Sequence, residues 1–190
     1  MTPWSPTGAF RTLRAPDRAD YAAHLLRLSP EDRRSRFHAA ASDAQIVAHA
    51  ARAIDGPGHV IGWFWEGALR GAAELALSRD GAEAEAALEV ESPFRGRGVG
   101  AALVELCALK AQNRGARRLV IHTTRSNVAM LRAARRNGAS FEFDLGDAEG
   151  IIPREPPTLA THLREAAAEQ AGLLNWARDA WLRRVRGGGA

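Results

Sequence analysis

The 190-residue chain has one cysteine, one tyrosine and one lysine, and these scarcities exclude several kinds of protein. Cys107 alone cannot form a disulfide within the chain or build a cysteine-based zinc site. Even the closest histidines, His49 and His59, lie too far apart in sequence to be ligands on neighbouring turns of one helix. We therefore expect no metal, and a domain that folds by burying its own apolar side chains, as a chain of this length can.

Long apolar runs and a strong net charge are also missing. No run approaches the roughly 18 residues of a membrane helix, and the first residues lack the basic and apolar regions of a signal peptide. A cytoplasmic protein without a membrane partner is therefore expected. The formal charge of +4 comes mainly from arginine, because Lys110 is the only lysine. So small an excess does not predict a nucleic-acid partner, although the arginines leave an RNA-directed enzyme as an alternative.

Hydrophobic periodicity predicts an α/β (α+β) fold. Alternating or apolar runs predict strands at 10–14, 59–65, 68–78, 83–91, 118–123, 141–145 and 151–152. Helical spacing and capping residues predict helices over 16–28, from 30, over 43–54, 99–113 and 127–137, and over 158–186 with a bend near Gly172. Short turns at Glu66-Gly67 and Asp80-Gly81 join three of the strands, which indicates an antiparallel meander.

A glycine-rich segment, Arg95-Gly96-Arg97-Gly98-Val99-Gly100-Ala101, lies between a predicted strand and a predicted helix. Glycines allow the backbone to turn its N–H groups toward a ligand, and the start of the helix adds unpaired amides and the positive end of its dipole. Such a loop can hold a phosphate or a diphosphate. It can also be a tight turn without a ligand.

Three phosphate-binding patterns compete for this loop. A P-loop needs Lys-Ser/Thr after the last glycine, but Ala101 follows here. The spacing of Gly96, Gly98 and Ala101 fits a dinucleotide-binding loop, but residues 119–125 supply no acid to bind a ribose. The coenzyme A pattern Arg/Gln-x-x-Gly-x-Gly/Ala is matched by Arg95, Gly98 and Gly100.

The surroundings of the loop resemble the GNAT acyltransferase superfamily. The resemblance covers about residues 9–152 and is most specific over 82–139, where strand, glycine loop, helix, strand, Asn127-led helix and Gly138 follow in the family's order. Residues 28–37 and 71–75 look like the branch that holds bacterial protein-lysine acetyltransferases. The resemblance implies a GNAT fold, with a mixed central sheet of about six or seven strands flanked by helices and an added C-terminal helix. It divides the chain into an acyltransferase domain at 9–152 and a helical extension at 158–186.

The resemblance also implies acetyl-CoA as cofactor, bound between two splayed strands, here 83–91 and 118–123. The backbone around Leu88 and Val90 would pair with the pantetheine arm. The amides of the loop would hold the diphosphate, and Asn127 would touch the cofactor. The loop residues expected at the site are Arg95, Gly96, Arg97, Gly98, Val99, Gly100 and Ala101.

Glu85 aligns with the position that carries the general base in that branch. Four glutamates, Glu83, Glu85, Glu89 and Glu91, share one face of the predicted strand, and such crowding raises the pKa of a carboxylate. Glu89 is the alternative base, and a reaction without a side-chain base is a further alternative. Glu85 can also be one member of a solvated row. The acceptor would be a primary amine, on a small molecule or on a protein lysine.

Many GNAT enzymes have a tyrosine in the helix after the asparagine, as an acid toward the leaving thiolate. The corresponding residues here are Ala133-Ala134-Arg135-Arg136, and Tyr21 is the chain's only tyrosine. The departure leaves two hypotheses: an acetyl-CoA-dependent N-acetyltransferase that needs no such acid, or a non-catalytic acyl-CoA-binding regulator.

The predicted C-terminal helix is amphipathic, with Leu163, Leu173, Leu174, Trp176 and Trp181 among charged residues. It can pack on its own sheet, pair with a second subunit in a homodimer, or meet a partner or membrane surface. Cys107 lies on the apolar stripe of helix 99–113 and is expected in the core. His122 ends a buried strand near the expected acceptor side.

Overall fold

The computed structural model describes residues 8–37 and 39–187, and within them seven strands form one mixed sheet. The strands are β1 (Ala9–Thr12), β2 (His59–Trp65), β3 (Ala68–Leu77), β4 (Glu83–Val90), β5 (Arg118–Thr124), β6 (Ser140–Asp144) and β7 (Asp147–Pro153). The helices are α1 (Arg18–Leu26), α2 (Pro30–Phe37), α3 (Asp43–Asp55), α4 (Val99–Asn113), α5 (Val128–Arg136) and α6 (Leu159–Gly187).

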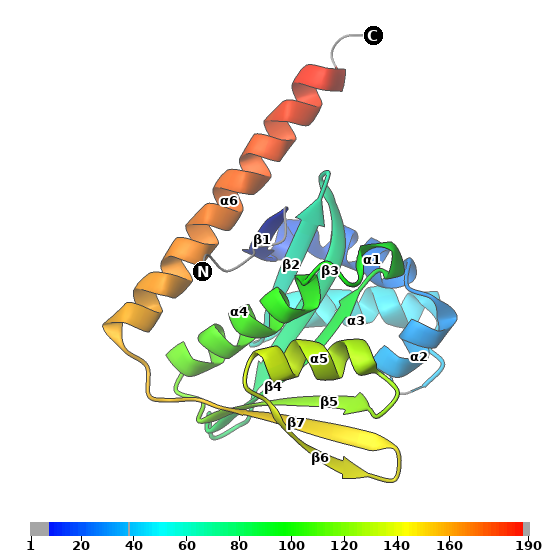
Figure 1. Cartoon of the computed structure of the whole chain (residues 1–190). Helices are drawn as coiled ribbons and strands as arrows, with labels where there is room; N and C mark the ends of the chain where they lie inside the picture. The colour runs from blue at the N-terminus through cyan, green and yellow to red at the C-terminus, as the bar shows by residue number, and fades with distance from the viewer. Residues whose placement is uncertain (1–7, 38, 188–190) are drawn as a thin grey trace.

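The sheet has the order β1-β2-β3-β4-β5-β7-β6 and lies between two layers of helices (Figure 1). β2, β3 and β4 form the predicted antiparallel meander. Helices α1 and α3 cover one face, and α4 and α5 cover the other. The predicted architecture, a mixed sheet of six or seven strands flanked by helices with an added C-terminal helix, is confirmed.

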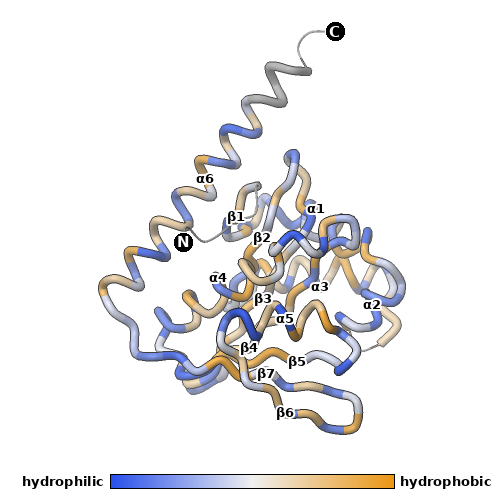
Figure 2. Tube along the Cα trace, viewed as in Figure 1, coloured by the Kyte–Doolittle hydropathy of each residue, from blue (hydrophilic) through white to orange (hydrophobic). Residues whose placement is uncertain are grey.

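Each face of the sheet has its own hydrophobic core. On the α4 side, Trp63, Leu103 and Cys107 pack with Leu119 and Ile121, and all five side chains are buried. On the α1 and α3 side, Tyr21, Leu25 and Ile46 pack against Phe64 and Leu69. Figure 2 shows the hydrophobic residues along the central strands and α4, as burial on both faces of a sheet requires. Cys107 is therefore a core residue, and burial raises the pKa of its thiol to about 12.

The sheet opens at its centre because β4 and β5 are paired only at their starts. The pair is parallel, and its register joins Glu83 to Arg118, Ala84 to Leu119 and Glu85 to Val120. β4 continues to Val90 and β5 to Thr124 without further pairing in this register. A gap between two neighbouring strands leaves backbone groups without a strand partner, which a compact sheet avoids unless a ligand or water takes that place.

The C-terminal helix α6 packs on its own domain, along β1 and α4, and then extends beyond the sheet (Figure 1). Glu165 pairs with Lys110 at 3.0 Å and Arg114 at 3.1 Å, and Glu169 accepts hydrogen bonds from the Thr12 amide and hydroxyl. The bend expected at Gly172 is wrong, because one helix runs through it. A Cβ at position 172 would lie 1.7 Å from the Phe10 carbonyl oxygen, so glycine is there to let α6 approach β1.

Replacing Gly172 by alanine shows whether this glycine weakens the helix or is needed for the close approach of α6 to β1. In an exposed helix the change would stabilise by about 1 kcal/mol. Here the clash with Phe10 should instead destabilise the protein by about 1–3 kcal/mol, measured by chemical denaturation. Leu174→Ala, at an exposed position of the same helix, is the control and should have little effect. A Gly172→Ala protein more stable than the parent would contradict the close approach of α6 to β1.

Within the described residues no helix is both long and apolar enough to cross a membrane.

Candidate functional site

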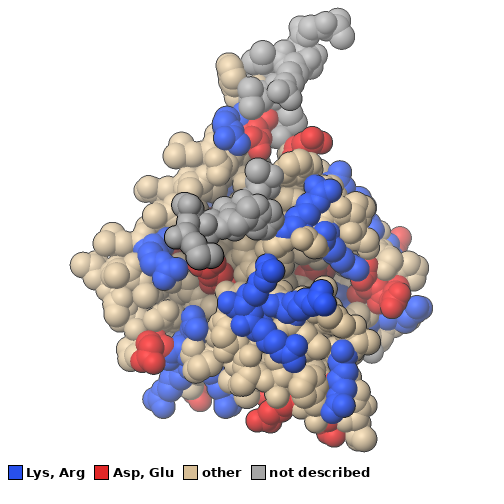
Figure 3. All heavy atoms as spheres, in the orientation of Figure 1, with Lys and Arg blue, Asp and Glu red and all other residues tan. Residues whose placement is uncertain are grey.

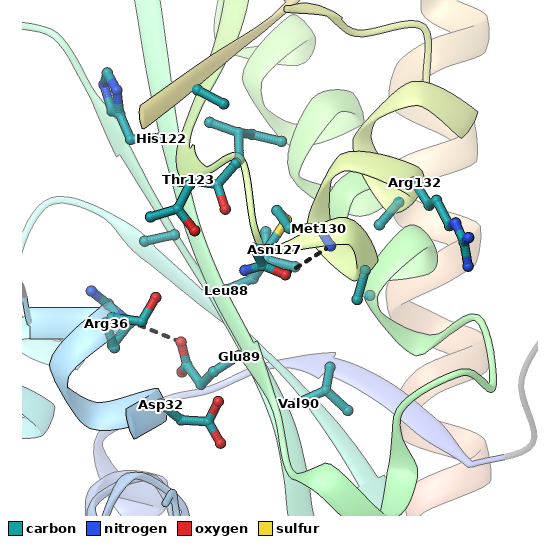
Figure 4. Close-up of a pocket in the computed structure, with 18 of the residues that line it drawn as sticks. Asp32, Arg36, Leu88, Glu89, Val90, His122, Thr123, Asn127, Met130 and Arg132 are labelled. Atoms are coloured by element: carbon teal, nitrogen blue, oxygen red, sulfur yellow. Dashed lines mark hydrogen bonds and ion pairs between the residues drawn. The ribbon is translucent and has the colours of Figure 1, made fainter. Parts of the chain in front are cut away.

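A cavity of about 1480 Å³ passes through the gap between β4 and β5. Figure 4 shows its two halves on either side of β4. Leu88 and Val90 point toward α5, whereas Glu89 points to the opposite face, toward α2. The cavity thus has one half bounded by the glycine loop and α5, and a second half bounded by α2 and the other face of the sheet.

The glycine loop adopts the backbone that its sequence predicted. Gly96 and Gly98 have φ of +74° and +77°, values that favour glycine, and Gly98 is the residue that precedes α4. No hydrogen bond joins the amides of residues 96–101 to any other described residue. These amides sit at the positive end of the α4 dipole, so the loop is built to accept an anion.

The loop also has room for a ligand. A Cβ at Gly96 would meet nothing within 4 Å, and a Cβ at Gly100 would lie at ordinary contact distance, 3.8 Å from Ala133 and 3.9 Å from Leu88. A larger side chain at Gly100 would project into the space between β4 and α5. Figure 3 shows a group of basic side chains on the face of the molecule where α5 and the start of α4 lie. Arg132 and Arg136 of α5 line the cavity. A diphosphate group fits this combination of free amides, open space and positive charge.

The two arginines of the loop itself are engaged elsewhere. Arg95 donates from Nε to the Val90 carbonyl at 2.9 Å and pairs with Asp32 of α2 at 2.6 Å. Arg97 donates to the Pro93 carbonyl and lies over the Phe94 ring. The backbone of the loop, and not these side chains, therefore offers the free hydrogen-bond donors.

Asn127 begins α5 and lines the cavity. Its side-chain oxygen accepts a hydrogen bond from the Met130 amide at 3.1 Å (Figure 4). This cap fixes the side chain, so its amide nitrogen is the group that it can offer to a ligand. The cofactor contacts predicted for Leu88, Val90, Asn127 and residues 95–101 remain predictions, but these residues all border the same gap.

The four glutamates predicted to share one face of β4 have different surroundings. Glu83 pairs with Arg118, and Glu91 is buried with His24, Arg27 and Arg70. Glu85, the predicted base, is exposed, and it lines the cavity as the last residue of β4 that pairs with β5. Its side chain makes no hydrogen bond or ion pair with another described residue. Its catalytic role stays a prediction.

Glu89 is buried, as Glu91 is, but it has different partners. Its side chain is 5% exposed, and its Oε2 pairs with Arg36 Nε of α2 at 3.0 Å. Burial, aided by the nearby Glu74 carboxylate, raises the pKa of Glu89 to about 7, although Arg36 acts in the opposite direction. The perturbation comes from burial and from Glu74 on β3, and not from crowding along the strand as the sequence had suggested.

Glu74 completes a polar cluster that the sequence did not predict. It accepts a hydrogen bond from the buried Tyr21 hydroxyl and lies 2.6 Å from both Arg36 and His49. Burial raises the pKa of Glu74, but the hydrogen bond to His49 and the charge of Arg36 outweigh it and lower the pKa to about 2. The cluster could not be predicted because Tyr21 lies on the apolar face of its helix, and the neighbouring sequence does not indicate a polar partner.

The raised pKa of Glu89 predicts a pH-dependent stability. The folded-state pKa of about 7 exceeds the ordinary 4.5, so the group's contribution is fully present below pH 4.5 and is lost as pH rises through 7. The difference corresponds to about 3 kcal/mol. Glu89→Gln, which cannot ionise, should therefore become more stable relative to the parent as pH rises from about 5 to 8.5. Chemical denaturation over this range tests it, and parallel stability curves would contradict the burial of an ionisable Glu89.

Proteins of known structure share this fold. The acetyltransferase (GNAT) family profile matches residues 14–139. The GNAT domain of PAT from S. lividans superposes with a TM-score of 0.66 at 21% identity, over 76% of this chain and 89% of that domain. A ribosomal L7/L12 alpha-N-protein acetyltransferase in complex with coenzyme A gives 0.64 at 17% identity, over 80% and 97%. The yncA protein of Salmonella typhimurium, solved with its cofactor acetyl-CoA, gives 0.60 at 19%, over 80% and 96%.

At these identities the solved structures show that the fold is shared. No curated protein sequence matches the chain.

Proposed function

The chain belongs to the GNAT acetyltransferase family, and from this we propose that it transfers an acetyl or short acyl group from coenzyme A to a primary amine. Acetyl-CoA is the acyl donor of the family. The observation that carries the proposal is the row of free amides at 96–101 beside the gap between β4 and β5. These two features fit the two ends of the donor: the diphosphate on the loop, and the pantetheine arm along Leu88 and Val90.

The reaction needs an uncharged amine at the thioester. When bound, acetyl-CoA supplies a carbonyl carbon that an amine nitrogen can attack, but amines are mostly protonated near neutral pH. We assign removal of this proton to Glu85, which lines the cavity where β4 and β5 part. Its exposure leaves the carboxylate open to the acceptor and to the solvent that finally takes the proton.

The leaving thiolate has no side-chain acid on α5. Ala133 and Arg136 line the cavity where an acid would have to stand. Tyr21 is buried on α1, and its hydroxyl donates a hydrogen bond to Glu74, so it does not serve this purpose. A thiolate of ordinary pKa is stable enough to leave as the anion, so the proposal does not need an acid.

The surface beside Glu85 supports a positively charged acceptor. The strand registers place His122, Glu149 and Glu142 in one row across β5, β7 and β6, and Thr124, Asp147 and Asp144 in the next row. Since Glu85 is in register with Val120, two residues before His122, all of these side chains lie on one face of the sheet. All six residues line the cavity.

We call this face the acidic face. Without a bound cation or basic group, the repulsion between its carboxylates destabilises it. Glu142 lies opposite Glu149, and Asp144 lies opposite Asp147, and like charges directly across a strand pair are destabilising. No arginine or lysine among the described residues pairs with Glu142, Asp144 or Asp147. We therefore propose a lysine in a basic peptide segment as the acceptor, because its neighbouring charges would offset this repulsion.

Two peptides and one double variant test the acceptor proposal. Acetyl transfer from acetyl-CoA is measured on a lysine flanked by arginines and on a lysine flanked by alanines. Glu142→Gln with Asp144→Asn should raise KM for the arginine-flanked peptide by about tenfold, with kcat and the alanine-flanked peptide little changed. Glu105→Gln, an exposed position outside the cavity, is the control. Equal effects on both peptides, or no acetylation of either, would overturn the basic-peptide acceptor.

A further inference from the structure

Helix α2 joins the two halves of the cavity through two side chains one turn apart. Asp32 reaches the glycine loop, where its Oδ1 lies 2.6 Å from Arg95 NH2. Arg36 reaches the opposite face of β4, where it pairs with Glu89 at 3.0 Å and with Glu74 at 2.6 Å. Figure 4 shows both side chains extending from the same helix toward β4. Residues four apart lie on one face of a helix, so a single face of α2 makes both contacts.

These polar contacts hold α2 in place without an apolar anchor along most of its length. None of its residues is buried, and Figure 2 shows the helix as hydrophilic. Its only large apolar residue, Phe37, is partly buried at the C-terminal end. Ser29 directly precedes the helix, accepts a hydrogen bond from the Asp32 amide at 3.0 Å and donates to Asp32 Oδ2 at 2.8 Å. Ser29 thereby orients the Asp32 carboxylate, and its other oxygen is directed to Arg95.

We propose that α2 is a clamp that couples the cofactor half of the site to the acceptor half, with Asp32 and Arg36 as its positioning residues. The inference rests on the proposed function, because it takes acetyl-CoA as the ligand of the loop. Arg95 is the first residue of that loop, and the guanidinium group that pairs with Asp32 also donates a hydrogen bond to the Val90 carbonyl. A ligand that fixes the loop also fixes Arg95. Because Asp32 of α2 pairs with Arg95, the helix is then held in place as well. Arg36 then holds the acceptor side of β4 against the same helix.

The acceptor end of the clamp includes groups that titrate. Tyr21 and His24 of α1, Arg36 of α2 and Glu74 of β3 face Glu89. His24 Nε2 lies 3.9 Å from Glu89 Oε1 and is buried without a hydrogen-bond partner among the described residues. Protonated Glu89 can donate toward it, which weakens the pair with Arg36. The clamp is therefore expected to loosen as pH falls through about 7, where Glu89 takes up its proton.

Amide hydrogen exchange of α2, read by mass spectrometry with and without acetyl-CoA, tests the clamp without knowledge of the acceptor. In the parent protein acetyl-CoA should slow exchange of α2 by about fivefold or more, together with exchange of the loop. In Asp32→Asn and in Arg36→Gln the loop should still be protected, while the slowing of α2 is lost. Arg36→Lys retains a positive charge that can reach Glu89, so this variant should keep part of the slowing of α2 exchange by acetyl-CoA.

A matched variant separates the clamp from general loosening of the helix. Arg33→Gln removes the pair between α2 and Asp43, which lies outside the cavity. Exchange of α2 should become faster in both states, but the slowing caused by acetyl-CoA should persist. Protection of the loop with no change in α2 in the parent protein would overturn the clamp. Absence of protection in the loop would instead contradict acetyl-CoA binding, and with it the proposed function.

Discussion

Glu85→Gln is expected to lower kcat for acetyl transfer by about 10²-fold or more and to leave acetyl-CoA affinity nearly unchanged. Glutamine has almost the same shape but cannot take a proton from the amine. Since Glu85 is exposed and makes no ion pair with another described residue, its replacement should not disturb the fold. Steady-state kinetics with a saturating lysine peptide measure the effect, and calorimetric titration with acetyl-CoA checks the affinity.

Two variants of the same strand make this result specific. Glu83→Gln removes a carboxylate from the same face that pairs with Arg118, and it should have little effect on kcat. If Glu89→Gln abolishes transfer while Glu85→Gln does not, the base lies four residues farther along the same face. A parent protein that binds acetyl-CoA but acetylates no amine would favour the non-catalytic regulator.

Gly100→Trp is expected to abolish acetyl-CoA binding. The missing side chain of Gly100 faces Ala133 on α5 and Leu88 on β4, so an indole there would fill the space between the loop and the gap. A ligand that binds only the folded state raises the melting temperature, and this rise should vanish in the variant. Thermal unfolding with and without acetyl-CoA provides the measurement.

Gly100→Ala is the control for this experiment. Its Cβ would make ordinary contacts at 3.8 and 3.9 Å, so the ligand-induced rise in melting temperature should largely persist. An unchanged rise in Gly100→Trp would mean that the donor binds elsewhere, and the loop would then be a tight turn without a ligand.

The sequence predicted those parts of the fold in which neighbouring residues determine the structure. The alternation at 83–91 predicted β4. Gly96 and Gly98 predicted a loop with positive φ values, which few other residues adopt. Capping residues predicted the start of the helix at 43, where the Ser42 side chain accepts a hydrogen bond from the Gln45 amide. The gap between β4 and β5 came from the family resemblance, because no local pattern shows that two strands pair only as far as Glu85 and Val120.

The parts that the sequence missed depend on contacts between distant residues. Glu89 resembles its neighbours on β4, and only the approach of Arg36 and the burial by α1 distinguish it. Gly172 looked like a point of bending because the atom that requires a glycine there, the Phe10 carbonyl oxygen, belongs to β1, far away in the sequence. The division into a domain at 9–152 and an extension at 158–186 remains a prediction, since α6 shares ion pairs with α4.

Native mass spectrometry of the purified protein with acetyl-CoA tests the central claim most directly, because it requires no acceptor. The free amides at 96–101 and the gap beside β4 predict one acetyl-CoA bound per chain, lost in Gly100→Trp and kept in Gly100→Ala. The same sample, given an arginine-flanked lysine peptide, should release coenzyme A and an acetylated peptide. A chain that binds no acetyl-CoA at saturating concentration, or binds it equally well with tryptophan at position 100, would contradict the account.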